Sequence, residues 1–233
     1  MTNLSTEEVV DISTKHTYGT WRAQKSWKPM HVVDAEGCTF TNAAGKTFLD
    51  FSSQLMCSSL GHKNQAVIDA ICEQAKTLPY IGPGFTTTAR AELSKLLLEV
   101  LPEGMERFFF TTSGTEANEG AIKLARKYFD DNSQPKRHEI ITMNNSFHGR
   151  TMGSLSATAQ TKFHAGFDPL LPGFKYVPFN NIAAVKKSIT KKTCAIMVEP
   201  IQGEGGVNLA DKAYFKALRK LCNENKILLI FDE

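Results

Sequence analysis

The sequence predicts an α/β fold in which helices flank a mostly parallel sheet and a small antiparallel meander comes first. Between residues 108 and 231, short apolar segments alternate with amphipathic ones, as in strands joined by helical crossovers. Residues 227–231 form a short, wholly apolar run, typical of a strand buried on both faces of a parallel sheet. Residues 32–51 instead alternate apolar and polar side chains around glycine-containing turns, which indicates antiparallel strands.

The amino-terminal third contains three kinds of segment. Residues 1 to about 30 are polar with irregularly placed aromatics, and we expect an extended arm there. The meander at 32–51 follows, with turns at glycines. Regularly spaced alanines and isoleucines then predict a helix over 64–77, and a second helix is expected over about 88–100, ending before Pro102.

Beyond this point strands and helices alternate. We expect strands at 108–111, 139–142, 175–177, 194–198 and 227–231, and helices at 115–128 and 213–223. The chain thus divides into an arm and meander over residues 1–60 and a large α/β domain over 61–233, whose sheet we expect to be incomplete.

Composition and charge exclude several classes of protein. The 233 residues are 42% hydrophobic and 22% charged, as in an ordinary globular protein. A net charge of +3 from scattered basic residues argues against a nucleic-acid partner. Five cysteines without a C-x-x-C pair indicate free thiols in a reducing compartment and no metal site. No apolar stretch approaches the ~20 residues that span a bilayer. We therefore expect a cytoplasmic protein without a membrane partner.

The first candidate binding motif spans residues 111–119 and opens a predicted helix after a predicted strand. Ser113 and Glu116 have the spacing of a capping box, and Gly114 permits close approach of a ligand to the backbone. Unpaired N–H groups at the positive end of a helix suit a phosphate. An ordinary helix cap is the alternative. Neither a Walker A lysine nor a G-x-G-x-x-G is present, which argues against ATP and NAD.

Three more motifs also follow strands. In the first, Phe147 offers a face to a flat ligand, and Arg150 offers a fork of donors to a carboxylate. In the second, Glu199 and Glu204 leave a strand end together with several glycines. The third is Asp232. A packed turn, a flexible loop and a helix cap are the respective alternatives. Because carboxyl ends of parallel strands share one edge of the sheet, all four motifs would converge on one crevice.

Together these motifs resemble the class III aminotransferases, which are pyridoxal-phosphate enzymes of fold type I, the aspartate-aminotransferase fold type. The middle of the chain is similar to the acetylornithine, ornithine and 4-aminobutyrate branch. Residues 50–55 are more similar to omega-amino-acid:pyruvate transaminases, which leaves the subfamily open. The segments that carry the resemblance are Ser113-Gly114-Thr115-Glu116-Ala117-Asn118, Phe147-His148-Gly149-Arg150-Thr151, Glu199-Pro200-Ile201-Gln202-Gly203-Glu204-Gly205-Gly206 and Phe231-Asp232-Glu233.

The resemblance implies a set of cofactor contacts. Asp232 would accept the pyridinium N–H of pyridoxal 5′-phosphate and keep the ring protonated, so that it can hold the electron pair released at the substrate Cα. An anionic acceptor is needed, which makes Asp more informative here than Asn. The phosphate would be bound by Ser113, Gly114 and Thr115, and the ring would be stacked or lined by Phe147, His148 and Glu199.

The resemblance also implies substrate contacts and an incomplete chain. Arg150 would bind a substrate carboxylate, and Glu204 would pair with a later arginine so that one site accepts an amino donor and a 2-oxo acid. The family's Schiff-base lysine lies downstream of the position that Asp232 matches, so we expect an amino-terminal fragment of a homodimeric aminotransferase, inactive alone. A non-catalytic protein that binds cofactor or pairs with a full-length subunit, and a class III lyase or aminomutase, remain open.

Overall fold

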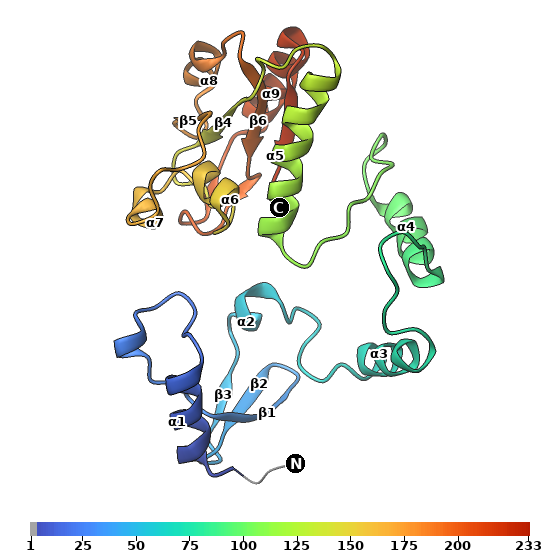
Figure 1. Ribbon diagram of the computed structural model, residues 1–233, viewed down its shortest axis with the longest axis vertical. Helices are drawn as coiled ribbons and strands as arrows, with labels where there is room; N and C mark the ends of the chain where they lie inside the picture. Colours follow the sequence, from blue (N-terminus) through green and yellow to red (C-terminus); the bar gives the residue numbers. More distant parts are fainter. Residues whose placement is uncertain (1–3) are drawn as a thin grey trace. The chain divides into compact units, whose positions relative to one another are not determined.

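The computed structural model describes residues 4–233 and contains two compact units (Figure 1). One ends at Lys95, and the other spans Leu96–Glu233. The second unit contains a four-stranded parallel sheet and all four motifs singled out above. The expected division between residues 60 and 61 stays a prediction. No helix within residues 4–233 combines the length and apolarity needed to cross a membrane.

The amino-terminal arm is not wholly extended as expected, because helix α1 spans Thr6–His16. A capping box starts this helix: the Ser5 N–H donates to Glu8 Oε2 over 2.8 Å, and the Glu8 N–H donates to Ser5 Oγ over 3.2 Å. The Ser-x-x-Glu spacing was therefore a usable helix signal that the irregular aromatics further along the arm obscured. A 3-10 turn at Gln24–Ser26 follows.

The predicted meander is confirmed. Strands β1 (Val32–Glu36), β2 (Thr39–Asn42) and β3 (Thr47–Leu49) pair antiparallel in chain order. Phe40 and Phe48 face each other across β2 and β3, with stacked rings whose centroids are 5.3 Å apart. Such cross-strand aromatic pairs hold the register of a small sheet.

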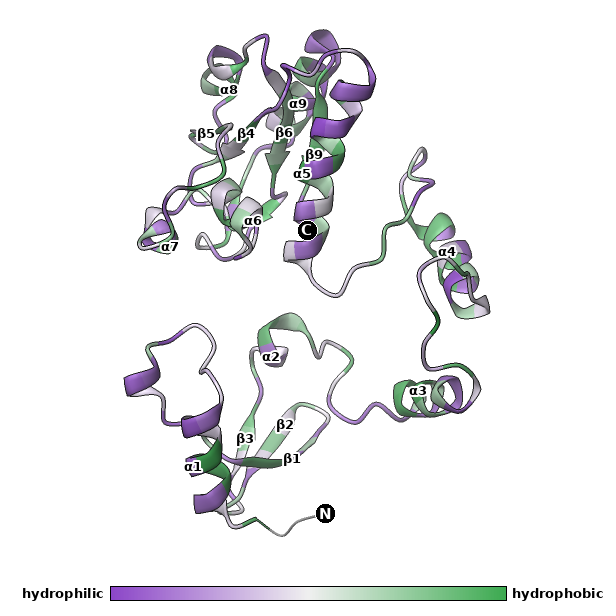
Figure 2. Cartoon of the chain, viewed as in Figure 1, coloured by the Kyte–Doolittle hydropathy of each residue, from purple (hydrophilic) through white to green (hydrophobic). Residues whose placement is uncertain are grey.

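The two helices expected next are also confirmed, as α3 (Gln65–Thr77) and α4 (Thr88–Val100), after a short helix α2 (Ser53–Met56). Asn64 caps α3 by accepting the N–H of Val67 over 3.3 Å. Figure 2 shows the apolar residues of α3 and α4 in green. No residue of either helix is buried within the described part of the chain.

The predicted parallel sheet is confirmed in the second unit, with strand order β5-β4-β6-β9. The strands are β4 (Glu139–Met143), β5 (Phe174–Val177), β6 (Thr193–Val198) and β9 (Leu228–Phe231). All residues of β6 are buried, as its apolar sequence predicts. Strand β9 differs from the expectation of burial on both faces, because it lies at an edge of the described sheet and leaves Phe231 42% exposed.

Helices cover both faces of this sheet (Figure 1). Alternate residues of β6 point to opposite faces, as strand geometry requires. Ala195 and Met197 pack with α5 (Gly114–Asp131), whereas Ile196 and Val198 pack with α9 (Lys212–Asn225). The remaining helices, which the sequence patterns did not predict, are α6 (Met152–Ala157), α7 (Thr161–His164) and α8 (Ile182–Ser188).

The strand expected at 108–111 is wrong for the described part of the chain. These residues form no ladder, and Phe109 and Phe110 are 77% and 42% exposed. An apolar run becomes a strand only when a neighbouring strand satisfies its backbone groups, and residues 4–233 supply none here. A short hairpin of β7 (Ile201–Gln202) and β8 (Asn208–Leu209) forms instead around the glycine-rich turn after β6.

Candidate active site

The amino terminus of α5 is the first part of the site. Ser113 caps this helix, and its Oγ accepts the N–H of Glu116 over 3.3 Å. Glu116 does not close a reciprocal box with Ser113. Its Oε2 accepts both the hydroxyl and the N–H of Thr112, over 2.6 and 2.9 Å. These bonds from Thr112 hold the pKa of Glu116 below its ordinary value.

The first turn of α5 meets the requirements of a phosphate cradle. The N–H groups of Gly114 and Thr115 have no acceptor among residues 4–233. A side chain built on Gly114 would meet no atom within 4 Å, so the space before the helix is open. Unpaired donors at a positive helix end bind phosphate. The Thr115 hydroxyl is used elsewhere, because it accepts the N–H groups of Arg150 and Thr151 over 3.2 and 3.3 Å.

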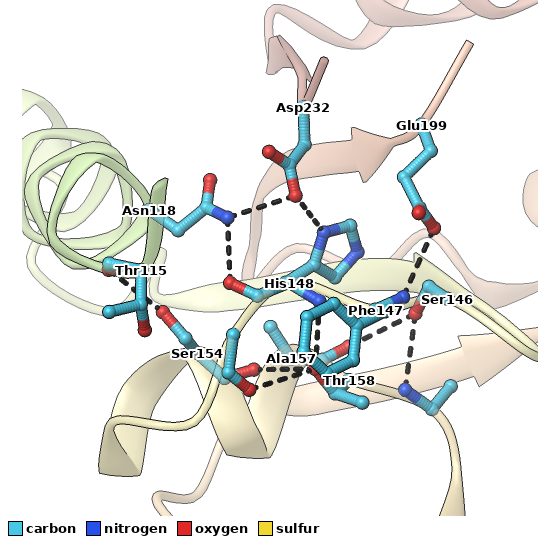
Figure 3. Close-up of polar contacts among 12 residues, drawn as sticks. Thr115, Asn118, Ser146, Phe147, His148, Ser154, Ala157, Thr158, Glu199 and Asp232 are labelled. Carbon is cyan, nitrogen blue, oxygen red and sulfur yellow. Dashed lines mark hydrogen bonds and ion pairs between the residues drawn. The ribbon is translucent and has the colours of Figure 1, made fainter. Parts of the chain in front are cut away.

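Asp232 lies at the centre of a polar cluster at the carboxyl edge of the sheet (Figure 3). Its Oδ2 accepts Asn118 Nδ2 over 2.9 Å and lies 2.7 Å from His148 Nδ1. The Asp232 N–H donates to Val198 O over 3.1 Å, which fixes the end of β9 against β6. The second carboxylate oxygen, Oδ1, has no partner among the described residues, and the side chain is 19% exposed. One oxygen is thus anchored and the other remains available to a ligand.

His148 is held from three directions. Its imidazole is buried, its N–H donates to Thr158 Oγ1 over 2.8 Å, and its carbonyl accepts Asn118 Nδ2 over 2.7 Å. Nε2 is buried without a partner within residues 4–233. Because a carboxylate only accepts, Nδ1 carries the proton that faces Asp232. His148 and Asn118 together orient one carboxylate oxygen with two donors.

Glu199 lies next to this cluster and is only 7% exposed. Its Oε2 accepts the N–H of Phe147 over 3.1 Å. Burial raises the pKa of Glu199 to about 7 despite that bond, and the charges of Asp232 and Glu204 act in the same direction. The carboxyl group therefore titrates near neutral pH.

This pKa predicts an effect on stability. Between pH 4.5, the ordinary value of Glu199, and about 7, the folded state binds more protons than the unfolded state, so the free energy of unfolding falls as pH rises through this window. Between pH 5 and 8 the free energy of unfolding of the parent chain should therefore fall. We expect this fall to be smaller by about 1–3 kcal/mol in Glu199→Gln. Urea unfolding at both pH values measures it, with the exposed Glu224→Gln as control. An unchanged pH dependence in Glu199→Gln would contradict the raised pKa.

The residues expected to contact substrate lie around α7. The Arg150 guanidinium carbon is 5.1 Å from the Phe147 ring centroid and 5.3 Å from that of Phe163. Glu204, at the β7–β8 turn, pairs with Lys162 over 3.6 Å, and the Lys162 ammonium lies 4.7 Å from the Phe163 centroid. Arg150 and Glu204 thus belong to one part of the surface. The Phe147 ring faces Arg150 and Phe163, and its stacking on a cofactor stays a prediction.

The structure brings Phe147, His148, Glu199 and Asp232 into one cluster, with the amino terminus of α5 beside it (Figure 3). Sequence reasoning missed two polar residues that organise this cluster, Asn118 and Thr158, and two that bond to the segments beside it, Glu119 and Lys162. Asn118 and Glu119 belong to a motif that was recognised, but no pattern assigned them a role. Thr115 and Glu119 are one helical turn apart, and this spacing was the available signal that both serve one face of α5.

Comparison with known proteins agrees with this arrangement. The family model for aminotransferase class-III matches residues 22–233. An acetylornithine aminotransferase of Methanocaldococcus jannaschii is 48% identical over 205 residues, which cover 88% of this chain and 51% of that protein. The chain spans about half the length of the curated relatives it matches.

Solved structures of transaminases also have the fold of this chain. An (S)-enantioselective omega-transaminase from Thermomicrobium roseum superposes with a TM-score of 0.93 at 27% identity, covering 99% of this chain and 57% of that one. An ornithine aminotransferase from Toxoplasma gondii, described with partial occupancy of pyridoxal phosphate at its active site, gives 0.85 at 27% identity, covering 97% and 53%. The expected fold type is confirmed. The chain belongs to the class III aminotransferase family, whose cofactor is pyridoxal 5′-phosphate.

Proposed function

We propose that this chain forms the cofactor-binding half of an aminotransferase that moves an amino group from a carboxylate-bearing amine to a 2-oxo acid. The observation that carries the proposal is the geometry of Asp232. Two donors, from Asn118 and His148, hold one carboxylate oxygen, and the other oxygen has no partner among the described residues. The carboxylate lies beside the open amino terminus of α5. A protonated pyridine ring with a phosphate arm requires an acceptor and an anion cradle of this kind.

Main-chain donors would hold the phosphate arm. The N–H groups of Gly114 and Thr115 would supply the bonds, and the α5 dipole would add a favourable field. Ser113 orients this turn by capping it. The Thr115 hydroxyl contributes indirectly, because it ties the Arg150–Thr151 backbone to the same helix.

Pyridoxal phosphate, when bound, supplies a ring that withdraws the electron pair left by the breaking Cα–H bond. Asp232 keeps the ring nitrogen protonated, because an anionic acceptor stabilises the pyridinium form. His148 and Asn118 prevent the carboxylate from turning away. Glu199 fixes the main chain at Phe147, and so the position of that ring.

Substrate recognition is assigned to the surface around α7. The planar donor fork of Arg150 suits a carboxylate, and two aromatic rings support it. Glu204 pairs with a second arginine when the bound substrate lacks a second carboxylate. The relatives' names support acetylornithine or ornithine as amino donor, and 4-aminobutyrate and omega-amino acids belong to the same chemical class.

The protein acts in the cytoplasm as a homodimer. The apolar residues of α3 and α4 support a second copy as the partner, since Ile71 and Leu96 are 63% and 60% exposed. Analytical ultracentrifugation of the wild-type chain and of a variant carrying Ile71→Glu measures this association.

The proposed reaction is tested with a hybrid enzyme, in which the part of the M. jannaschii relative that follows the matched half is joined after Glu233. We expect turnover of N-acetylornithine that depends on both pyridoxal phosphate and a 2-oxo acid. Ammonia release or isomerisation without a 2-oxo acid would indicate a lyase or aminomutase instead. A folded, cofactor-loaded hybrid without turnover of any omega-amino donor would contradict the proposal.

A further inference from the structure

Glu119 gathers three hydrogen bonds on one carboxylate oxygen. Its Oε1 accepts Thr151 Oγ1 over 2.6 Å, the Gly153 N–H over 2.7 Å and the Ser154 N–H over 3.1 Å. A carboxylate that accepts three donors is a strong local anchor, because charge-assisted hydrogen bonds are shorter and stronger than neutral ones.

These bonds give α6 an amino-terminal cap from α5, because its own N-cap residue makes no side-chain cap bond. Thr151 occupies the N-cap position of α6 but makes no side-chain cap bond, and its hydroxyl donates to Glu119 instead. The N–H groups of Gly153 and Ser154, which a cap residue would otherwise satisfy, are met from α5. The contact is close: a side chain on Gly153 would come within 2.4 Å of Glu119 Oε2.

Both ends of α6 connect to the loop that carries the cofactor-ring and substrate contacts. At the carboxyl end, Thr158 Oγ1 accepts the N–H of His148 over 2.8 Å. At the amino end, the Thr115 hydroxyl accepts the N–H groups of Arg150 and Thr151. The hydroxyls of Thr115 and Thr151 lie 2.9 Å apart, which continues the chain of bonds to Glu119. The position of α6 thus sets the path of residues 147–151.

We propose that Glu119 is a positioning residue that locks the loop at residues 147–151 to α5. This inference rests on the proposed function, because it assigns Glu119 an effect on the cofactor ring and not on the phosphate. The phosphate donors are main-chain N–H groups in the first turn of α5, capped by Ser113, and α6 bonds to this turn at the Thr115 carbonyl and not at these N–H groups. The ring contacts, through Phe147 and the His148–Asp232 pair, do depend on α6.

The test compares two ligands on the full 233-residue chain, pyridoxal phosphate and inorganic phosphate, by titration calorimetry. We expect Glu119→Ala to lower the affinity for pyridoxal phosphate about tenfold, because three hydrogen-bond donors lose their acceptor. Affinity for inorganic phosphate should stay within about twofold. Glu119→Gln keeps a carbonyl acceptor and should recover most of the loss. Asp130→Ala, which removes an exposed carboxylate from the same helix, is the control.

Amide hydrogen exchange gives a readout that does not need the cofactor. In Glu119→Ala, the N–H groups of residues 151–154 should exchange at least about tenfold faster, while those of β4 and β6 keep their protection. If Glu119→Ala lost affinity for both ligands equally and its amides exchanged faster throughout the sheet, the role of Glu119 would be merely structural. That result would overturn the inference. Unchanged exchange at residues 151–154 would overturn it too. A wild-type chain that binds no pyridoxal phosphate would instead reject the proposed function, while exchange still tests the anchor.

Discussion

Asp232→Asn in the hybrid enzyme is expected to lower kcat by about 100-fold or more while leaving the fold intact. Asparagine keeps an oxygen that can accept from His148 and Asn118. Its amide nitrogen then occupies the place of the second carboxylate oxygen and offers a donor where an acceptor is needed. The ring nitrogen would lose its proton, and with it most of its capacity to hold an electron pair.

Steady-state kinetics with N-acetylornithine measures this effect, and Asp130→Asn, an exposed position on α5, serves as the matched control. The expected pattern is a fall in kcat with cofactor content close to that of the parent. Turnover within a factor of three of the parent would exclude Asp232 from the assigned role.

Gly149→Ala is expected to have the largest effect on folding within the site. Gly149 has a φ of +125°, a conformation that L side chains rarely adopt. A Cβ at this position would lie 2.3 Å from Thr115 Oγ1, the atom that holds the Arg150 and Thr151 backbone. Strain and the loss of these bonds together should cost about 2–4 kcal/mol of unfolding free energy.

The matched control is Gly203→Ala, because a side chain there meets no atom within 4 Å and Gly203 is not in the left-handed region. Urea unfolding monitored by circular dichroism compares the two variants with the parent chain. We expect the control to stay within about 0.5 kcal/mol of the parent. A Gly149→Ala variant as stable as this control would contradict the close packing of the loop on α5.

The central strands of the sheet, β4 and β6, could be predicted because they are buried and their sequences are largely apolar. Residues 193–198 are apolar or small throughout, and every one of them is buried. The same reasoning failed at residues 108–111, since an apolar run identifies a potential strand but not the neighbour that must pair with it. Helix α1 was missed for the opposite reason: its local capping signal was present, but none of its residues is buried, so its apolar pattern is weak.

The site was predictable at the level of motifs but not of contacts. Placing four motifs after strands of one sheet predicts that they meet, and Phe147, His148, Glu199 and Asp232 do. Asn118 and Glu119 could not be assigned this way. Polar residues on a helix usually face solvent, and only the fold shows that these two face the loop after β4. Their partners are about 30 or more residues away in the chain, beyond the reach of local patterns.

We propose that Asp232 accepts the protonated ring nitrogen of pyridoxal phosphate. The most direct test of this role is the ¹⁵N NMR shift of ring-labelled pyridoxal phosphate bound to this chain, compared between wild type and Asp232→Asn at pH 8. The structure predicts a protonated pyridine nitrogen in the wild type and an unprotonated one in the variant. An unprotonated nitrogen in the wild-type complex, or the same shift in both proteins, would contradict the account.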